Sequence, residues 1–270
     1  MRALPPPPRS PIPTPAGGVA ETLRLLRVAY RRLKSAEGDL YLTRYGAPFW
    51  QHLAPENWFA PDWFAARRTQ LQGTSTIYKL PTKPVAGVSI DLVVRFSRIG
   101  QDVPLDTQSF ERNLDVEFNS PFEEFALVME LRALRPRIYT KRPLAIFVPA
   151  KRLQLWQTGR AESKIAAKLA RHPEVQLDIL RQYILLYGWI EGLNVMQVLE
   201  RGTTRVPLSD EFSRAITRRA IGDLARHGFR MADIKPEHLL LRVRPDGSLL
   251  HLRDGRVAYA LVDYELLERS

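Results

Sequence analysis

Apolar positions near the start of the chain recur at helical spacing. Val19, Leu23, Leu26, Tyr30 and Leu33 lie three or four residues apart, and arginine or lysine fills many of the positions between them. Because residues three and four apart share one face of a helix, this spacing predicts an amphipathic helix with a basic outer side.

Residues 47–66 are rich in aromatic side chains but have no regular period. Prolines interrupt the aromatic residues, which are Phe49, Trp50, Trp58, Phe59, Trp63 and Phe64. We expect an irregular segment that packs on the core. A stacking platform for nucleic-acid bases is the alternative.

From residue 73 onward, strand-like patterns alternate with helical ones. Predicted strands cover residues 73–80, 88–96, 144–150 and 182–190, and short strands joined by turns follow at 239–243, 249–252 and 257–263.

Three helical segments are predicted between these strands. One begins at Ser120-Pro121, since proline favours the first helical position and two acids follow in the first turn. One or two helices are expected over 161–181, divided near His172-Pro173. The last covers 210–227 and ends at Gly228, a typical C-terminal stop.

Composition narrows the class of protein. The chain has 270 residues, of which 45% are hydrophobic and 26% charged, as expected for a globular protein with a sizeable core. It has no cysteine, so disulfides, cysteine-ligated zinc and a cysteine nucleophile are excluded. No apolar run approaches the roughly 20 residues of a membrane span. The N-terminus lacks the apolar core of a secretory signal. We therefore expect no transmembrane segment and a cytoplasmic location.

The net charge of the chain indicates which classes of partner to expect. The formal net charge is +11, and the isoelectric point is about 10.1. Such a field attracts polyanions, so RNA, acidic lipid and nucleotide phosphates are candidate partners. A basic protein without any such partner is the simpler alternative. The best stretch for nucleic acid is 132–152, which contains seven arginines and lysines.

Two acids and a lysine near the end of the chain carry the candidate chemistry. Asp233 and Lys235 occupy a turn after the last predicted helix, and Asp263 lies at the exit of the last predicted strand. An acid in a loop and an acid at a strand end can converge on one site, which suits phosphoryl transfer. One carboxylate accepts a hydroxyl proton, the other holds Mg²⁺, and the lysine neutralises charge on the phosphoryl group.

Five stretches make this pattern specific. "LARHGFRMADIKPEHLLL" resembles the catalytic loop of protein kinases, and "LVDYE" resembles their D-F-G motif. Upstream, "LLYGWIEGLNVMQVL" is similar to the kinase strand, hinge and following helix. "FEEFALVMELRAL" is similar to helix C, and "VVRF" to the strand that carries the V-A-I-K lysine. The matches follow the family's order between residues 71 and 266.

The resemblance implies an α+β, bilobal protein-kinase-like fold. Its N-lobe is an antiparallel β-sheet plus helix C, and its C-lobe is reduced and mostly helical. Because only seven residues follow Asp263, the chain is most similar to small atypical kinases of the RIO or lipopolysaccharide-kinase type, or is a truncated kinase. The expected segments are a Pro-rich disordered tail (1–18), a helical and aromatic extension (19–70), the N-lobe (71–187, with a helical insert at 151–181), and the hinge with the C-lobe (188–270).

The resemblance also implies residue roles, with ATP and Mg²⁺ as cofactors. Asp233 matches the catalytic base, Lys235 the lysine that contacts the γ-phosphate, and Asp263 the Mg²⁺ ligand. The phosphate acceptor is not implied. The other matches in the nucleotide site are Arg95 at the strand lysine, Glu124 as the helix C glutamate with Glu123 as runner-up, Gly73 in the phosphate-covering loop, Trp189 and Ile190 at the hinge, and His238.

Several positions depart from the kinase pattern and keep alternatives open. Arg95 replaces lysine, His238 replaces the asparagine that would bind a second metal, and Glu265 replaces the glycine of D-F-G. The first hypothesis is an ATP-dependent phosphotransferase of atypical type. The second is a pseudokinase that binds nucleotide or acts as a scaffold. The third is a basic nucleic-acid-binding protein on the same fold.

Overall fold

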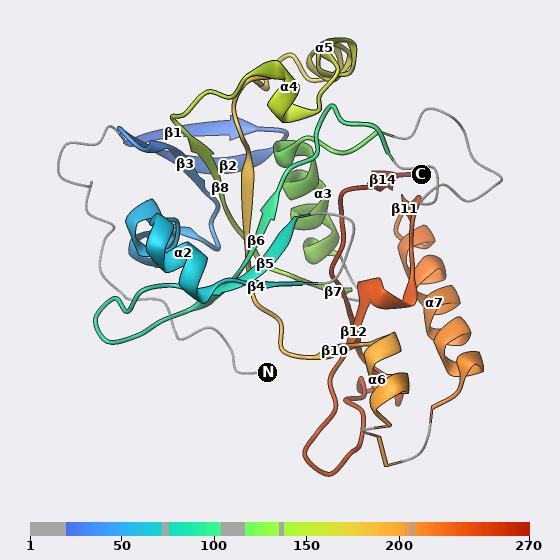
Figure 1. Ribbon diagram of the computed structural model, residues 1–270. Coiled ribbons are helices and arrows are strands. Elements are labelled where there is room, and N and C mark those ends of the chain that lie inside the picture. Colours follow the sequence, from blue (N-terminus) through green and yellow to red (C-terminus); the bar gives the residue numbers. More distant parts are fainter. Residues whose placement is uncertain (1–19, 72–75, 104–116, 135–137, 203, 206–207) are drawn as a thin grey trace.

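The computed structural model describes residues 20–71, 76–103, 117–134, 138–202, 204–205 and 208–270. The Pro-rich segment 1–18 and Gly73 lie outside these ranges. A large antiparallel sheet with helices around it forms one part of the molecule, and two smaller sheets with helices α6 and α7 form the other (Figure 1).

The large sheet has eight strands in the order β1-β2-β3-β8-β9-β6-β5-β4, and all neighbours are antiparallel. Its strands are β1 (Ala20–Leu25), β2 (Val28–Ser35), β3 (Gly38–Leu42), β4 (Thr69–Gln70), β5 (Ile77–Pro81), β6 (Asp91–Phe96), β8 (Pro143–Pro149) and β9 (Ile184–Gly188).

The helix predicted over residues 19–34 is wrong. The segment forms β1 and β2, which pair in a hairpin where Leu23 lies opposite Tyr30. The turn residues Leu26 and Arg27 have positive φ angles of 46° and 66°. Glycine or asparagine usually marks such a turn. Without that mark, apolar residues on two paired strands imitate helical spacing, and residues 20–42 add β1, β2 and β3 to the sheet instead of a helix before it.

The central strands are covered on both faces, and their alternation decides which side chains meet. Leu92 and Val94 on β6 belong to one apolar cluster, whereas Val93 belongs to the other. Since successive side chains of a strand point to opposite faces, Arg95 shares the face of Val93. On β9, Tyr187 lies in the same cluster as Val93.

The aromatic segment covers one of these faces, as the sequence predicts. It folds into η1 (Ala47–Phe49), α1 (Trp50–Leu53), η2 (Pro55–Asn57) and α2 (Pro61–Arg67). Trp58 is fully buried, donates from Nε1 to the Leu53 carbonyl at 2.9 Å, and packs edge-on against Phe147. The prediction of core packing is confirmed for this tryptophan.

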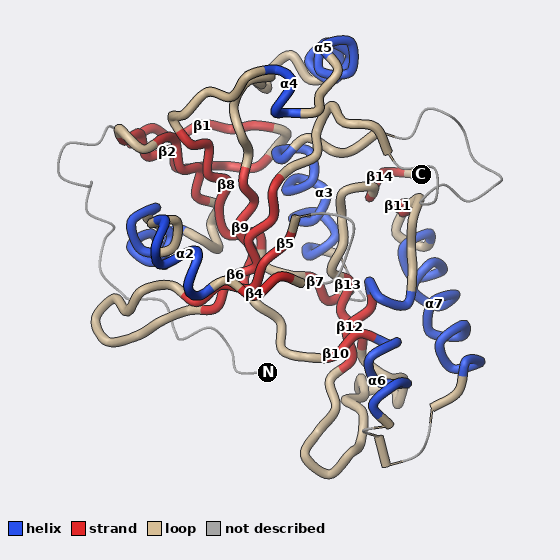
Figure 2. The backbone as a smooth tube through the Cα atoms, in the orientation of Figure 1, coloured by secondary structure: helices blue, strands red, loops and turns tan. Residues whose placement is uncertain are grey.

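Helix α3 (Pro121–Ala133) covers the opposite face (Figure 2). It begins where the sequence predicts, because Ser120 caps it and forms a reciprocal capping box with Glu123. Phe125 and Val128 are fully buried against the sheet. Two further helices, α4 (Leu155–Thr158) and α5 (Glu162–Arg171), follow β8, and no second helix forms over 172–181.

The C-terminal part contains α6 (Val195–Arg201), α7 (Asp210–Ala225) and the short η4 (Pro236–His238). Gly228, with a φ of 73°, follows α7 as predicted. One sheet has the order β10 (Leu193–Asn194), β12 (Leu239–Leu241), β13 (Tyr259–Leu261) and β7 (Tyr139–Thr140), and β11 (Phe229–Met231) pairs with β14 (Leu267–Arg269). The strand predicted over 249–252 is reduced to two isolated bridges.

The predicted fold class is confirmed. The molecule is α+β, with an antiparallel N-terminal sheet, one long helix against it, and a helix-containing C-terminal part. The hairpin β5–β6, α3, β8 and β9, α6 and α7, and the final strands follow one another in the expected order. The residue boundaries between the lobes stay a prediction. None of the described helices is long and apolar enough to cross a membrane.

Candidate functional site

A cavity of about 320 Å³ lies where the large sheet meets the C-terminal part. Asp233, Lys235, His238 and Asp263 all line it, although they come from two separate stretches of the chain. Its volume falls in the range of small-molecule sites. The fold therefore brings together the acids and the lysine that sequence reasoning selected.

Asp233 and Lys235 lie in the loop between β11 and η4. The pairing of β11 with β14 and of β12 with β13 holds this loop at both ends. Lys235 Nζ lies 3.0 Å from Asp233 Oδ2, and the side chains are 41% and 16% exposed, respectively. The acid is thus largely enclosed beside a cation that reaches the solvent side.

Asp263 lies two residues after β13 ends and faces several donors. Its Oδ1 lies 3.4 Å from Arg95 Nη1 and accepts from the Glu265 main-chain N–H at 3.3 Å, and its Oδ2 lies 3.6 Å from His238 Nε2. Burial alone would raise the pKa of Asp263, but His238, Arg95 and the Glu265 N–H together lower it below its ordinary value. The carboxylate is therefore ionised at neutral pH, as a metal ligand requires.

Arg95 and Glu124 form a buried ion pair behind the cavity. Arg95 Nη2 donates to Glu124 Oε2, and the Tyr187 hydroxyl donates to the other oxygen. The two side chains of the pair are only 6% and 1% exposed. Arg95 Nη1 also lies 3.6 Å from Glu265 Oε2. One guanidinium thus links α3 to the two acids in the segment after β13.

Glu123, the runner-up in sequence, has other partners. It completes the capping box of α3, contacts Lys168 Nζ at 2.9 Å, and lies 3.1 Å from His172 Nε2. Because neighbouring positions on a helix point about 100° apart, only Glu124 can face Arg95.

The remaining predicted site residues do not all line this cavity. Trp189 lines the cavity, and Lys79 Nζ lies 4.7 Å from its ring centroid. Ile190 does not line it; together with Trp189, it lines another cavity of about 300 Å³ near β7 and β12. Gly192 permits close approach of the link after β9 to β12, since a Cβ there would meet the Leu241 carbonyl oxygen at 2.6 Å. Gly73 lies outside the described residues.

Sequence reasoning missed Lys141, which it assigned to a basic stretch. Lys141 lies between β7 and β8, is 7% exposed, and lines the same cavity. Its Nζ donates to the Val262 carbonyl at 2.8 Å, and burial lowers its pKa to about 7. No local signal marks it, because only the packing of β13 beside β7 encloses it.

The basic stretch 132–152 is also less exposed than its sequence suggests. Lys141 is buried, and Arg132 Nη1 donates to the Thr140 carbonyl at 2.5 Å. Lys151 and Arg152 are exposed at the far end. The described part of this stretch is therefore no continuous basic surface.

The donor set bears on the kind of metal site. The described residues include no group of three or more His, Asp or Glu side chains that could hold a metal ion. Mg²⁺ usually takes one or two carboxylates together with substrate phosphates and water. Asp263 fits such a shared site, whereas a metal bound by protein alone does not fit.

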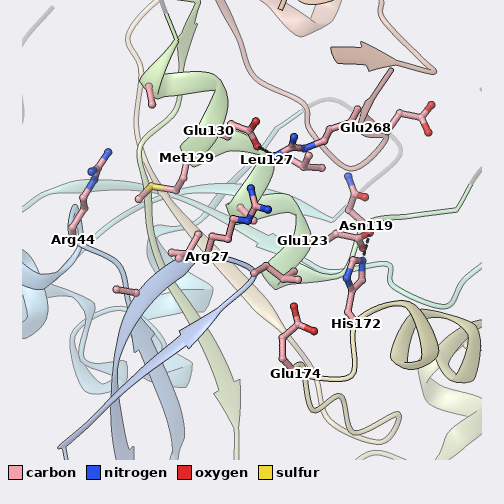
Figure 3. Close-up of a pocket in the computed structure, with 16 residues that line it drawn as sticks. Arg27, Arg44, Asn119, Glu123, Leu127, Met129, Glu130, His172, Glu174 and Glu268 are labelled. Atoms are coloured by element: carbon pink, nitrogen blue, oxygen red, sulfur yellow. Dashed lines mark hydrogen bonds and ion pairs between the residues drawn. The ribbon is translucent and has the colours of Figure 1, made fainter. Parts of the chain in front are cut away.

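A larger cavity of about 900 Å³ lies between the β1–β2 turn and α3 (Figure 3). Arg27, Leu127 and Met129 are among its lining residues. Its acid Glu123 contacts His172, as the dashed line in Figure 3 marks, and Glu130 pairs with Arg269. Of the described residues predicted for the kinase-like site, only Glu123, the runner-up for the helix C glutamate, lines it.

Comparisons with known proteins give likenesses in structure. The chain is similar to WaaP in complex with acyl carrier protein, with 12% identity and a TM-score of 0.41, over 86% of this chain and 73% of that one. It is also similar to the Rio2 kinase of Chaetomium thermophilum in an ADP/Mg²⁺-phosphoaspartate complex, with 14% identity and a TM-score of 0.37, over 89% of this chain and 59% of the other. No family model and no curated protein matches. The function proposed below therefore rests on the side chains of the cavity.

Proposed function

We propose that this protein is an ATP- and Mg²⁺-dependent phosphotransferase of the atypical kinase type. One observation carries the proposal: Asp233, Lys235 and Asp263 line a single cavity. The buried pair of Arg95 and Glu124 directly behind Asp263 supports it.

The lining suits a nucleotide. Leu71, Ile77, Trp189 and Leu240 supply apolar surface that can contact a base. The acids and lysines of the same cavity supply charged groups for phosphates and their metal. Mg²⁺, when bound by Asp263 together with the phosphates, would neutralise phosphate charge.

Three residues of the chain then have separate roles in the transfer reaction. Asp233 accepts the proton of the acceptor hydroxyl while that oxygen bonds to the γ-phosphorus of ATP and the bond to ADP breaks. Lys235, 3.0 Å from Asp233, offsets the negative charge of the transferred group. Arg95 holds Asp263 at the cavity through its contact with Oδ1. The acceptor is a hydroxyl compound that the site does not identify further.

A second candidate function, nucleotide binding without transfer, is favoured by the contacts of the two acids. Asp233 is ion-paired with Lys235, and Asp263 is shared between Arg95 and His238. Where kinases place a metal-binding asparagine, His238 has a buried Nδ1 without a hydrogen-bond partner among the described residues. A site of this kind could hold nucleotide yet bind metal too weakly for turnover.

Two measurements distinguish these functions. We expect ATP with Mg²⁺ to raise the melting temperature, because a ligand of the native state stabilises it by mass action. We expect formation of ADP to fall by about 10²–10⁴-fold in Asp233→Asn, the usual contribution of general base catalysis.

The matched control is Asp62→Asn, an exposed acid on α2, which should retain full activity. Stabilisation by ATP without any turnover would support the second candidate. No effect of ATP and Mg²⁺ on melting would refute both kinase-like functions. In that case, salt-dependent binding of RNA would favour the nucleic-acid alternative.

A further inference from the structure

Lys141 is fixed at the cavity by both its main chain and its side chain. Its N–H donates to the buried Tyr264 hydroxyl at 2.7 Å, and its Nζ donates to the Val262 carbonyl at 2.8 Å. These two acceptors belong to the residues on either side of Asp263. The lysine, which lines the cavity, is therefore held beside the proposed metal ligand.

The ammonium of Lys141 retains donors that the protein does not use. It has three N–H donors, and Val262 accepts from one of them. No carboxylate among the described residues forms an ion pair with it. Because a buried cation with unused donors is costly, an anionic ligand in the cavity would supply what the protein leaves out.

The other cations at this site are engaged. Arg95 is held by Glu124, Asp263 and Glu265. Lys235 pairs with Asp233, and Arg98, which also lines the cavity, has its Cζ 4.2 Å from the Phe118 ring centroid. The arginine that occupies the strand position of the kinase lysine is thus committed to carboxylates, which leaves the phosphates to another cation of the cavity.

We propose that Lys141 is the phosphate-binding cation of this site, with its ammonium donating to phosphate oxygens of a bound nucleoside diphosphate or triphosphate. The assignment rests on the proposed function and adds a binding residue to it. In this arrangement Arg95 is a positioning residue, and the segment between β7 and β8 supplies the contact that β6 supplies in the kinase pattern.

The test compares a ligand with phosphates and one without. Binding of ADP with Mg²⁺ and of adenosine is measured by calorimetry on the full chain and on Lys141→Met and Lys141→Arg. We expect Lys141→Met to lose at least about tenfold in affinity for ADP, as for a hydrogen bond to a charged group, and to keep its affinity for adenosine. Lys141→Arg should retain part of the ADP affinity, because the positive charge remains.

The matched control is Lys164→Met on α5, which lies outside the cavity and should bind both ligands like the unaltered chain. Adenosine binding by Lys141→Met also reports that the cavity is intact. Equal losses for ADP and adenosine, or no loss for ADP, would overturn the assignment while leaving the proposed function standing. Failure of the unaltered chain to bind either ligand would overturn the proposed function, and the assignment with it.

Discussion

Removal of the Arg95 guanidinium is the perturbation that most directly tests the internal charge arrangement. In Arg95→Met, Glu124 would keep the Tyr187 hydroxyl but lose its cation. Glu265, whose side chain is 7% exposed, and Asp263 would lose the same group. Methionine can fill much of the space but cannot offset buried negative charge.

The expected cost follows from burial. Glu124 is 1% exposed and Arg95 6% exposed, so solvent screens the pair little. Breaking a buried ion pair by removing one partner typically costs about 3–5 kcal/mol. For a chain of this size we expect a fall in melting temperature of about 10 °C. Arg95→Met/Glu124→Leu should recover part of the loss, because it removes the unpaired charge as well.

The assay is urea unfolding followed by tryptophan fluorescence, with Arg230→Met as the matched control. Arg230 pairs with Glu268 at 2.7 Å, but the two side chains are 52% and 42% exposed. Such a surface pair contributes about 0–1 kcal/mol. If Arg95→Met costs no more than Arg230→Met, the buried cluster does not contribute as argued.

Asp263→Asn should remove the part of the ATP-induced rise in melting temperature that needs Mg²⁺; an unchanged Mg²⁺ effect would contradict the proposed ligand. Burial lowers the pKa of Lys141 from its usual 10.5 to about 7, so between these values the unfolded chain binds a proton that the native state has lost. Relative to Lys141→Met, the free energy of unfolding should therefore rise from pH 7 to pH 9, by up to about 1.4 kcal/mol per pH unit; parallel pH curves would speak against this. Leu26→Asn/Arg27→Gly should raise the free energy of unfolding by about 1 kcal/mol, and with it the urea midpoint, since asparagine and glycine suit the positive φ angles of the turn. A lower midpoint would show that the turn is not strained.

Where local signals determine the outcome, the sequence predicts this protein well. Ser120, Pro121 and the acids after them fix the start of α3, because a cap and a pre-set φ act within a single turn. Gly228 lies in the turn after α7, which ends at Ala225, two residues before the predicted end, and it takes a φ that other residues avoid. The selection of Asp233 and Asp263 rested on their places after a helix and after a strand, together with the resemblance of the stretches around them to kinase motifs.

Only the tertiary structure decided the features that depend on which segments pack together. Spacing alone could not distinguish a helix over 19–34 from two paired strands, because the turn at Leu26 lacks a glycine or asparagine signal. Burial and charge partners are set by contacts between distant segments: Glu124, not Glu123, faces Arg95, and Lys141 is enclosed by residues more than 100 positions away. A lysine's neighbours in sequence do not specify its solvation, so its role at the site follows from the fold.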